Sequence, residues 1–268
     1  ATLTGWSVFW FIGPILILGL IPAIDLAAGI DRSNPPDDLI ATLEADKYYR
    51  WITYFFLPLQ YLALIWACWL WAGDTLSVVD KVGLALTVGT VAGVGINTAH
   101  ELGHKKEKVE RWLAKIALAQ SFYGHFYIEH NRGHHVRVAT PEDPASSRFG
   151  ETFWAFLPRS VWGSLKSSIE LERTRLKRAG KSFWHPSNDV LNAWAFSIVL
   201  WGALLAIFGI GILPFLLIQG IYGFSLLETV NYLEHYGLLR QKTASGRYER
   251  CTPQHSWNSD HICTNIFL

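Results

Sequence analysis

VGLALTVGTVAGVGINTAHELGHKK (residues 82–106) combines a long apolar run with two closely spaced histidines. Residues 82–99 carry no charged side chain, and about 20 apolar residues are enough for a helix to cross a lipid bilayer. His100 and His104 follow at once, with Glu101 between them. This stretch therefore predicts a membrane-spanning helix that delivers two histidines to one membrane surface.

Four other segments are similarly long, apolar and almost free of charge. We expect five spans, at about 5–24, 51–72, 79–99, 190–208 and 213–234, with the last two forming a tight hairpin. Buried helices of a soluble protein are a poorer explanation, because several such runs rarely occur outside lipid. The predicted fold is all-α: a polytopic transmembrane helix bundle with a cytoplasmic histidine-rich cap, in which residues 1–268 form a single membrane-embedded catalytic domain.

Lysine and arginine are unevenly distributed, with 15 of the 23 lying in 101–188. Because such residues favour the cytoplasmic side, we predict a cytoplasmic insert at 100–188 and a cytoplasmic tail at 235–268, which we expect to be incomplete. Within the insert, 112–128 is predicted to pack without crossing, and 154–178 to form an amphipathic helix at the membrane interface. The net charge of +1 gives no indication of nucleic-acid binding.

The three cysteines, Cys68, Cys251 and Cys263, include no C-x-x-C pair. This spacing argues against a disulfide framework, a zinc ribbon or a rubredoxin-type iron site within the chain.

Six histidines form three groups next to predicted spans or packed helices. Residues four apart share one face of an α-helix, so His100 and His104 can point at one metal, as can His130 and His134. The adjacent pair His134 and His135 suits two metals better than one. His235, in NYLEHYG, ends the fifth span and so lies at the same membrane depth.

H-E-x-x-H is also the pattern of zinc proteases. A catalytic zinc ion, however, uses three protein ligands and one open position, whereas four histidines remain here after the first two. That surplus favours two metal ions, and imidazole ligands suit Fe, Cu, Ni or Zn without choosing among them. A metal transporter would need ionisable groups along the spans, and these are almost absent.

Five segments together carry a resemblance to a known family: NTAHELGHKKE, YGHFYIEHNRGHH, VATPEDPASSR, NYLEHYGLLRQK and HSWNSDHICTN. They resemble the integral-membrane alkane 1-monooxygenases, a branch of the histidine-rich membrane diiron enzymes that also includes fatty-acid desaturases. The resemblance implies that two Fe ions are bound by six histidines: His100, His104, His130, His134, His135 and His235. It also implies one earlier span and a later H-x2-H-H box, which we expect to lie outside residues 1–268.

The same resemblance implies a monooxygenase reaction in a bacterial inner (cytoplasmic) membrane. One atom of O2 would enter the terminal methyl of a medium- or long-chain n-alkane drawn from the bilayer. Rubredoxin, separate or fused, would supply two electrons, with rubredoxin reductase and NADH upstream. A fatty-acyl desaturase or hydroxylase with the same histidine boxes is the main alternative, and an intramembrane zinc protease is the second.

Other residues have weaker indications. Candidates for supporting the ligands are Glu101, Glu129, Glu234, His255 and His261, while His125 is predicted to be structural or supporting. Glu228 lies inside a predicted span, where a carboxylate is a functional candidate. Asp143 in TPEDP could be a functional carboxylate or, equally, a turn residue. Candidates for lining a substrate channel are Leu16, Ile17 and Leu20; the resemblance places Ile17 where the family sets chain length.

Overall fold

The computed structural model describes residues 4–31, 33, 36 and 47–264. Within these residues the fold is helical, and β pairing is limited to isolated bridges between Ile30 and His261 and between Lys242 and Tyr248. The all-α prediction is therefore confirmed. Arg32, in the loop after the first span, and the last four residues of the predicted tail lie outside the described part of the chain.

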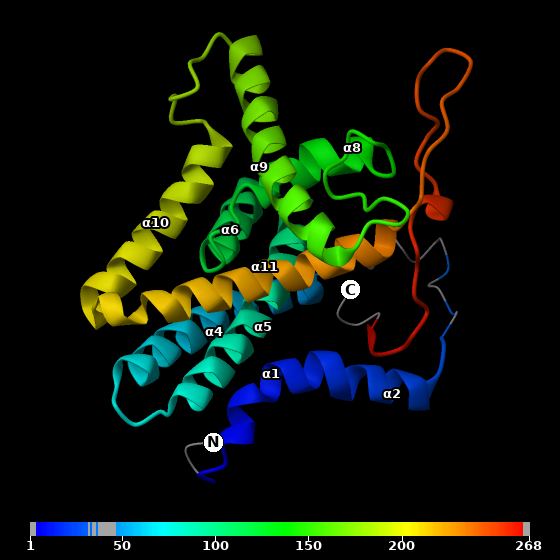
Figure 1. The fold of residues 1–268 in the computed structure, drawn as a ribbon. Coiled ribbons are helices and arrows are strands. Elements are labelled where there is room, and N and C mark those ends of the chain that lie inside the picture. The colour runs from blue at the N-terminus through cyan, green and yellow to red at the C-terminus, as the bar shows by residue number, and fades with distance from the viewer. Residues whose placement is uncertain (1–3, 32, 34–35, 37–46, 265–268) are drawn as a thin grey trace.

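Five helical segments are long and apolar enough to cross a membrane (Figure 1). The first covers Ser7–Ala28, and the others are α4 (Lys47–Ala72), α5 (Val78–Gly103), α10 (Asp189–Phe208) and α11 (Leu213–His235), the last preceded by the short η4 (Ile210–Ile212). Each of the five predicted spans coincides with one of these segments. The helix bundle with five candidate spans is thus as predicted.

The first span is irregular: η1 (Ser7–Phe11) is a 3-10 helix, α1 (Ile12–Ile15) is α-helical, η2 (Leu16–Leu20) is a π-helix, and α2 (Ile21–Ala28) completes it. Pro14 has no N–H for the carbonyl of Trp10, four residues earlier. That carbonyl instead accepts from the Thr87 hydroxyl at 2.6 Å, and the same hydroxyl accepts from the Gly13 N–H at 3.0 Å. Helix α5 thus satisfies polar backbone groups that lipid could not.

Helices α5 and α11 pack closely through glycines. A Cβ atom on Gly89 would lie 2.9 Å from the Gln219 carbonyl oxygen, and one on Gly223 would lie 3.1 Å from the Gly89 carbonyl oxygen. Small residues allow such close backbone approach between membrane helices. This packing fixes the helices that carry His100 and His104 on one side and His235 on the other.

The cap contains α6 (Lys108–Ala119), α7 (Phe126–Glu129), η3 (His130–His134), α8 (His135–Arg137) and α9 (Phe153–Arg178). Helix α6 has 12 residues, which is short of the roughly 20 needed for a span. Helix α9 forms where an amphipathic helix was predicted, but serines and Glu172 dominate its buried face. The apolar residues Val161 and Ile169 are half-buried beside that face.

A buried ion cluster ties the cap to α10. Glu172, which is fully buried on α9, accepts from Arg132 at 2.7 Å, from Arg175 at 2.5 Å and from the backbone N–H of Asp189 at 2.6 Å. Asp189 in turn accepts from Lys115 on α6 at 2.7 Å and from Arg132 at 2.5 Å. The carboxylates of Glu172 and Asp189 therefore hold α6, η3, α9 and α10 together.

The C-terminal segment returns to the first span (Figure 1). The buried carboxylate of Asp25 accepts from the N–H of Cys263 at 2.7 Å and from the N–H of Thr264 at 3.1 Å, and it also bonds to the Thr264 hydroxyl. Together with the bridge between Ile30 and His261, these bonds hold residues 261–264 against the end of α2.

Candidate metal centre and apolar pocket

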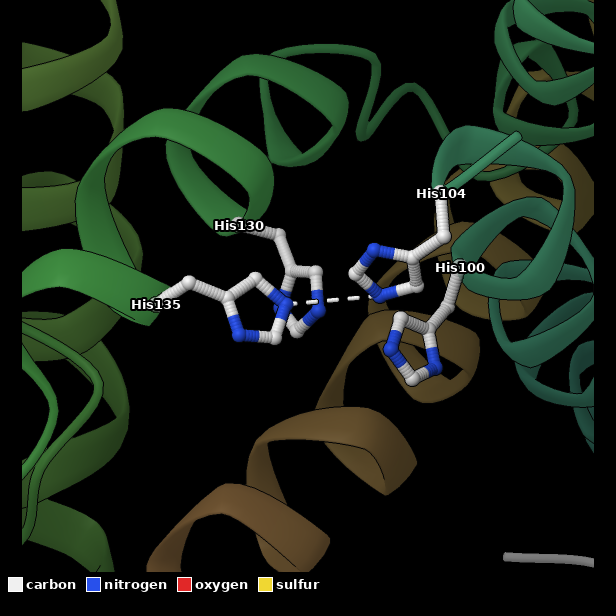
Figure 2. Close-up of side chains that lie close together, drawn as sticks. All are labelled: His100, His104, His130 and His135. Atoms are coloured by element: carbon white, nitrogen blue, oxygen red, sulfur yellow. Dashed lines mark hydrogen bonds between the residues drawn. The ribbon is translucent and has the colours of Figure 1, made fainter. Parts of the chain in front are cut away.

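Four histidines from three elements converge on one point (Figure 2). One ring nitrogen from each of His100, His104, His130 and His135 lies within 4.8 Å of the others. Nε2 of His135 lies 3.3 Å from Nε2 of His104. Helix α5 supplies His100 and leads directly to His104, while η3 and α8 supply the other two.

A π turn selects which histidines face α5. In η3 the N–H of His135 bonds to the carbonyl of His130, five residues earlier. The ring centroids of His130 and His135 are then 4.4 Å apart, against 5.4 Å for His130 and His134. α-Helical spacing predicts His130 and His134 on one face; the π turn instead brings His135 to the cluster in place of His134. Such turns often occur at functional sites.

His134 faces a different set of partners. Its Nδ1 lies 2.9 Å from Oδ2 of Asp143, and its ring centroid lies 4.9 Å from that of His235. Ser146 donates to the same carboxylate oxygen at 2.6 Å, and the Ala145 N–H donates to the other oxygen at 3.2 Å. A carboxylate that holds one ring nitrogen leaves the other available to a metal ion.

Burial and hydrogen bonding shift the pKa values of His134 and Asp143 in opposite directions. Burial alone would raise the pKa of Asp143, but the bond from His134 and that from Ser146 outweigh it and hold the pKa below the ordinary value. Burial likewise would lower the pKa of His134, but Asp143 outweighs it and raises that pKa. Asp143 is therefore an ionised partner of His134 and not only a turn residue.

The cluster is suited to bind a metal ion because its imidazoles are neutral. Burial lowers the pKa of His104 and His130 and brings that of His135 to about 4. A metal ligand must be deprotonated, and these rings meet that condition at neutral pH. Within the described residues, Nε2 of His130 and Nε2 of His235 are buried without a hydrogen-bond partner. Metal ions bound at these two histidines would satisfy both nitrogens.

The three glutamates that flank ligands differ in position. Oε1 of Glu101 lies 3.7 Å from Nδ1 of His100, and Oε2 of Glu234 lies 3.8 Å from Nε2 of His235. Glu129 turns away and accepts from Arg137 at 2.6 Å. Burial raises the pKa of Glu129 to about 7.

Gly133 makes room for that ion pair. A Cβ atom at this position would lie 2.5 Å from Nη2 of Arg137 and 2.5 Å from Oε1 of Glu129.

The remaining predicted histidines lie outside the cluster of four. His255 is buried, and its Nδ1 accepts from the Thr252 N–H at 3.0 Å. Nδ1 of His261 lies 3.0 Å from the Ser259 hydroxyl. His125 packs edge-on against Tyr123, with ring centroids 4.5 Å apart. These contacts are consistent with structural roles.

An apolar pocket of about 290 Å³ lies between the first span, α5 and α11. Its walls include Ile17, Ile21 and Leu226, and two cluster histidines, His100 and His130, also line it. The pocket therefore reaches the candidate metal centre.

Of the three residues predicted to line a channel, Ile17 lines this pocket. Leu16 and Leu20 are absent from its described lining and are exposed on the first span.

Asn97 and Asn231 line the same pocket and are not among the site residues predicted from the sequence. Asn97 precedes His100 by three residues, and Asn231 precedes His235 by four. Each amide is therefore one helical turn from a histidine within an apolar run, and that spacing is the signal that could have identified them.

An open groove of about 930 Å³ lies on the cap. Asp143, the partner of His134, lines it, together with Glu142 and Glu170. Seven basic side chains also line it: Arg132, Arg137, Arg148, Arg159, Lys166, Arg175 and Arg178. The groove thus extends from the basic surface of the cap to a carboxylate that contacts a histidine.

Comparison with known proteins agrees with this geometry. Residues 81–268, which hold all six histidines, match the family "Fatty acid desaturase". Alkane 1-monooxygenase 2 of Pseudomonas aeruginosa is 42% identical over 94% of this chain and 68% of its own length. This chain belongs to the alkane 1-monooxygenase family. Alkane 1-monooxygenases of Acinetobacter baylyi (50% identical over 98% of this chain) and Pseudomonas putida (47% over 99%) are further relatives.

The family resemblance seen in the sequence is thereby confirmed. The chain spans 64% of the length of the Acinetobacter baylyi relative and 66% of that of the Pseudomonas putida relative.

Proposed function

We propose that this protein hydroxylates the terminal methyl of medium- or long-chain n-alkanes, using O2 and two electrons. One observation carries the proposal: His100 and His130 belong both to the histidine cluster and to the lining of the apolar pocket. A substrate held in that pocket would lie beside bound metal. The names of relatives that are 42–50% identical support the same reaction.

The chain's own residues have two tasks in this proposal. The imidazoles of His100, His104, His130 and His135 would hold one iron ion, and His134 with His235 would contribute to a second. Iron, when bound, would supply the activation of O2 that C–H hydroxylation requires. The pocket would bind the alkane by burial alone, at roughly 0.8 kcal/mol per CH2. A pocket that ends at His100 and His130 presents one chain end, which favours the terminal carbon.

The balanced reaction is RH + O2 + 2 e⁻ + 2 H⁺ → ROH + H2O, so electrons must come from a donor. Residues 1–268 contain no C-x-x-C pair for a rubredoxin-type site. We assign this role to rubredoxin, separate or fused, reduced by its reductase and NADH. An acidic donor would be attracted to the basic groove on the cap. Asp143 in that groove contacts His134 and would bring the docked donor close to the centre.

We further propose that the cap faces the cytoplasm from a bacterial inner membrane. The unequal distribution of lysine and arginine supports this orientation. The test is cysteine labelling in intact cells, in a background without Cys251 and Cys263. A cysteine at exposed position 170 should resist an impermeant reagent, whereas one at position 74, between α4 and α5, should react. The opposite pattern would reverse the orientation.

A fatty-acyl desaturase or hydroxylase is the second candidate, because residues 81–268 match the fatty acid desaturase family. It would act on acyl chains and leave free alkanes unchanged. The zinc-protease alternative has less support, since His130 and His135 join the H-E-x-x-H pair in one cluster.

The decisive experiment supplies the purified protein, in nanodiscs, with iron, rubredoxin, reductase, NADH, an alkane and ¹⁸O2. The expected product is the 1-alkanol with one ¹⁸O atom. His130→Ala should abolish it, whereas His185→Ala, in the loop before α10, should not. Conversion of acyl chains without alkanol formation would favour the desaturase alternative. Iron analysis should give two ions per chain.

A further inference from the structure

Glu228 is a buried carboxylate within α11, seven residues before His235. Ionisable groups inside membrane segments are costly unless they are well partnered. The Tyr123 hydroxyl donates to Oε1 at 2.7 Å, and the Ser160 hydroxyl donates to Oε2 at 2.6 Å. The Asn231 side chain, one turn further along α11, also interacts with the carboxylate. Both oxygens of Glu228 are therefore used.

The partners of Glu228 lie on different segments. Tyr123 is in the turn between α6 and α7, which leads directly to His130, while Ser160 is on α9. Glu228 itself is on the helix that ends with His235. One carboxylate thus joins both histidine-bearing segments that meet at the His134–His235 contact.

Tyr123 is held in place on its other sides. Its ring stacks on Phe224 of α11, with centroids 5.0 Å apart, and its side chain is almost completely buried. The preceding residue, Phe122, has a φ of 55°, which is uncommon for a residue with a Cβ atom. The hydroxyl therefore has a fixed direction, and its bond to Glu228 determines how the turn lies against α11.

We propose that Glu228 is a positioning residue for the metal centre. By fixing the turn at Tyr123 against α11, it sets the separation of His235 from His134, whose ring centroids are 4.9 Å apart. This inference rests on the metal centre proposed above. Asn231 extends the effect to the pocket, because its side chain both contacts Glu228 and lines the cavity beside His130.

Directional bonds distinguish this role from ordinary packing. An apolar side chain at position 228 could fill the space, but it would leave the hydroxyls of Tyr123 and Ser160 without their acceptor. Glutamine is the conservative replacement: its oxygen can accept from Tyr123, and its NH2 group can donate to the Ser160 oxygen. A positioning role therefore predicts that Glu228→Gln keeps the metal affinity of the wild type, whereas Glu228→Leu loses it.

The test is titration of the purified protein with Co²⁺, followed by its visible absorption bands, with no turnover required. Glu228→Leu and Tyr123→Phe should each weaken Co²⁺ binding by about tenfold or more and alter the bands, as changes around metal ligands do. Glu228→Gln should stay close to wild type. The double variant Tyr123→Phe/Glu228→Leu should be no weaker than Glu228→Leu, because the Tyr123 hydroxyl acts only through its bond to Glu228.

Gln219→Leu is the matched control. Gln219 is also buried on α11 and donates to the Gln120 carbonyl at 2.8 Å, but it lies 16 residues before His235. This variant should lower the unfolding temperature without changing Co²⁺ affinity. Equal loss of affinity in Gln219→Leu would overturn the proposal, as would wild-type affinity and bands in both Glu228→Leu and Tyr123→Phe.

Failure of the underlying metal centre has a different signature. Wild-type protein that binds no Co²⁺ would refute both the centre and the role of Glu228. Binding that His130→Ala abolishes but Glu228→Leu leaves unchanged would refute the role of Glu228 alone. If Glu228→Leu fails to fold, Tyr123→Phe decides, since it removes only one hydroxyl.

Discussion

Oδ2 of Asp143 lies 2.9 Å from Nδ1 of His134, and both side chains are buried. The bond joins η3 to the loop before α9, and Ser146 and the Ala145 N–H hold the carboxylate from its other sides. Because Asp143 engages Nδ1, Nε2 is the nitrogen of His134 that is left for a metal ion, and the ring of His235 lies beside that of His134, with centroids 4.9 Å apart.

Asp143→Asn should weaken metal binding by about 10–100-fold, the usual cost of losing a carboxylate that orients a ligand. The amide can no longer stabilise the Nδ1–H form of His134 by charge. Metal titration measures the effect. Glu142→Gln is the control, since Glu142 is the adjacent residue but its carboxylate bonds to the exposed Tyr248 hydroxyl. Equal affinities for Asp143→Asn and wild type would contradict the assigned role.

Ile17→Trp should shorten the range of alkanes that the protein hydroxylates. Ile17 lines the apolar pocket, so an indole there would exclude the far end of a long chain. Each excluded CH2 forfeits roughly 0.8 kcal/mol, which gives a cutoff over a few carbons. The measurement is the product profile across an alkane series. Leu16→Trp, on the exposed side of the same helix, should leave the profile unchanged; a uniform loss in both variants would indicate misfolding.

Glu172→Ala should destabilise the protein by about 2–3 kcal/mol, because it removes the buried acceptor of Arg132, of Arg175 and of the Asp189 N–H. Chemical unfolding in detergent gives the difference. Glu170→Ala provides the comparison two residues away on α9. Its pair with Arg173 is exposed, so the change should stay within about 1 kcal/mol. Similar effects of the two substitutions would exclude a special role for the buried cluster.

Glu151→Gln should reduce stability in a pH-dependent way. Arg159 donates to both oxygens of Glu151, at 2.6 and 2.7 Å, and this bonding lowers the pKa of Glu151 from its ordinary value of 4.5. A lowered pKa in the folded state stabilises the protein above the ordinary value, and the contribution is lost as the pH falls through the folded value. The variant should therefore be less stable by about 1 kcal/mol at pH 7.

Below that folded-state pKa, the stabilities of Glu151→Gln and wild type should converge. Unfolding curves between pH 7 and pH 3 measure the gap, and a gap that stays constant over this range would contradict the ion pair.

Charge and apolarity were sufficient to predict the five spans, because a bilayer imposes a fixed length on each. The sequence also identified the histidines, whose grouping is visible in one dimension. It could not predict which of them face one another, since that depends on the π turn at 130–134, which no composition signal marks. The same holds for α9, where Ser160, Ser164 and Ser168 occupy the buried face and only the fold shows that Ser160 faces the Glu228 carboxylate.

Asp143 and Glu228 illustrate the remaining gap. Both were visible as carboxylates in unusual places, but their partners His134 and Tyr123 are identified only by the fold. Hydrogen bonds between segments 68–105 residues apart, such as those of Glu228, have no periodic signature in the sequence.

The π turn also makes the local helix type a determinant of the centre. A π turn is equivalent to one residue inserted into an α-helix, and each added residue rotates everything after it by about 100°. At unchanged length, an α-helical turn from His130 would place His134 on the face of His130 and move it towards α5 in place of His135. Deleting one residue between His130 and His134 would instead restore the α-helix and leave His135 four residues after His130, on the same face. Substitutions that convert the π turn to an α turn would therefore reassign ligands without removing any histidine.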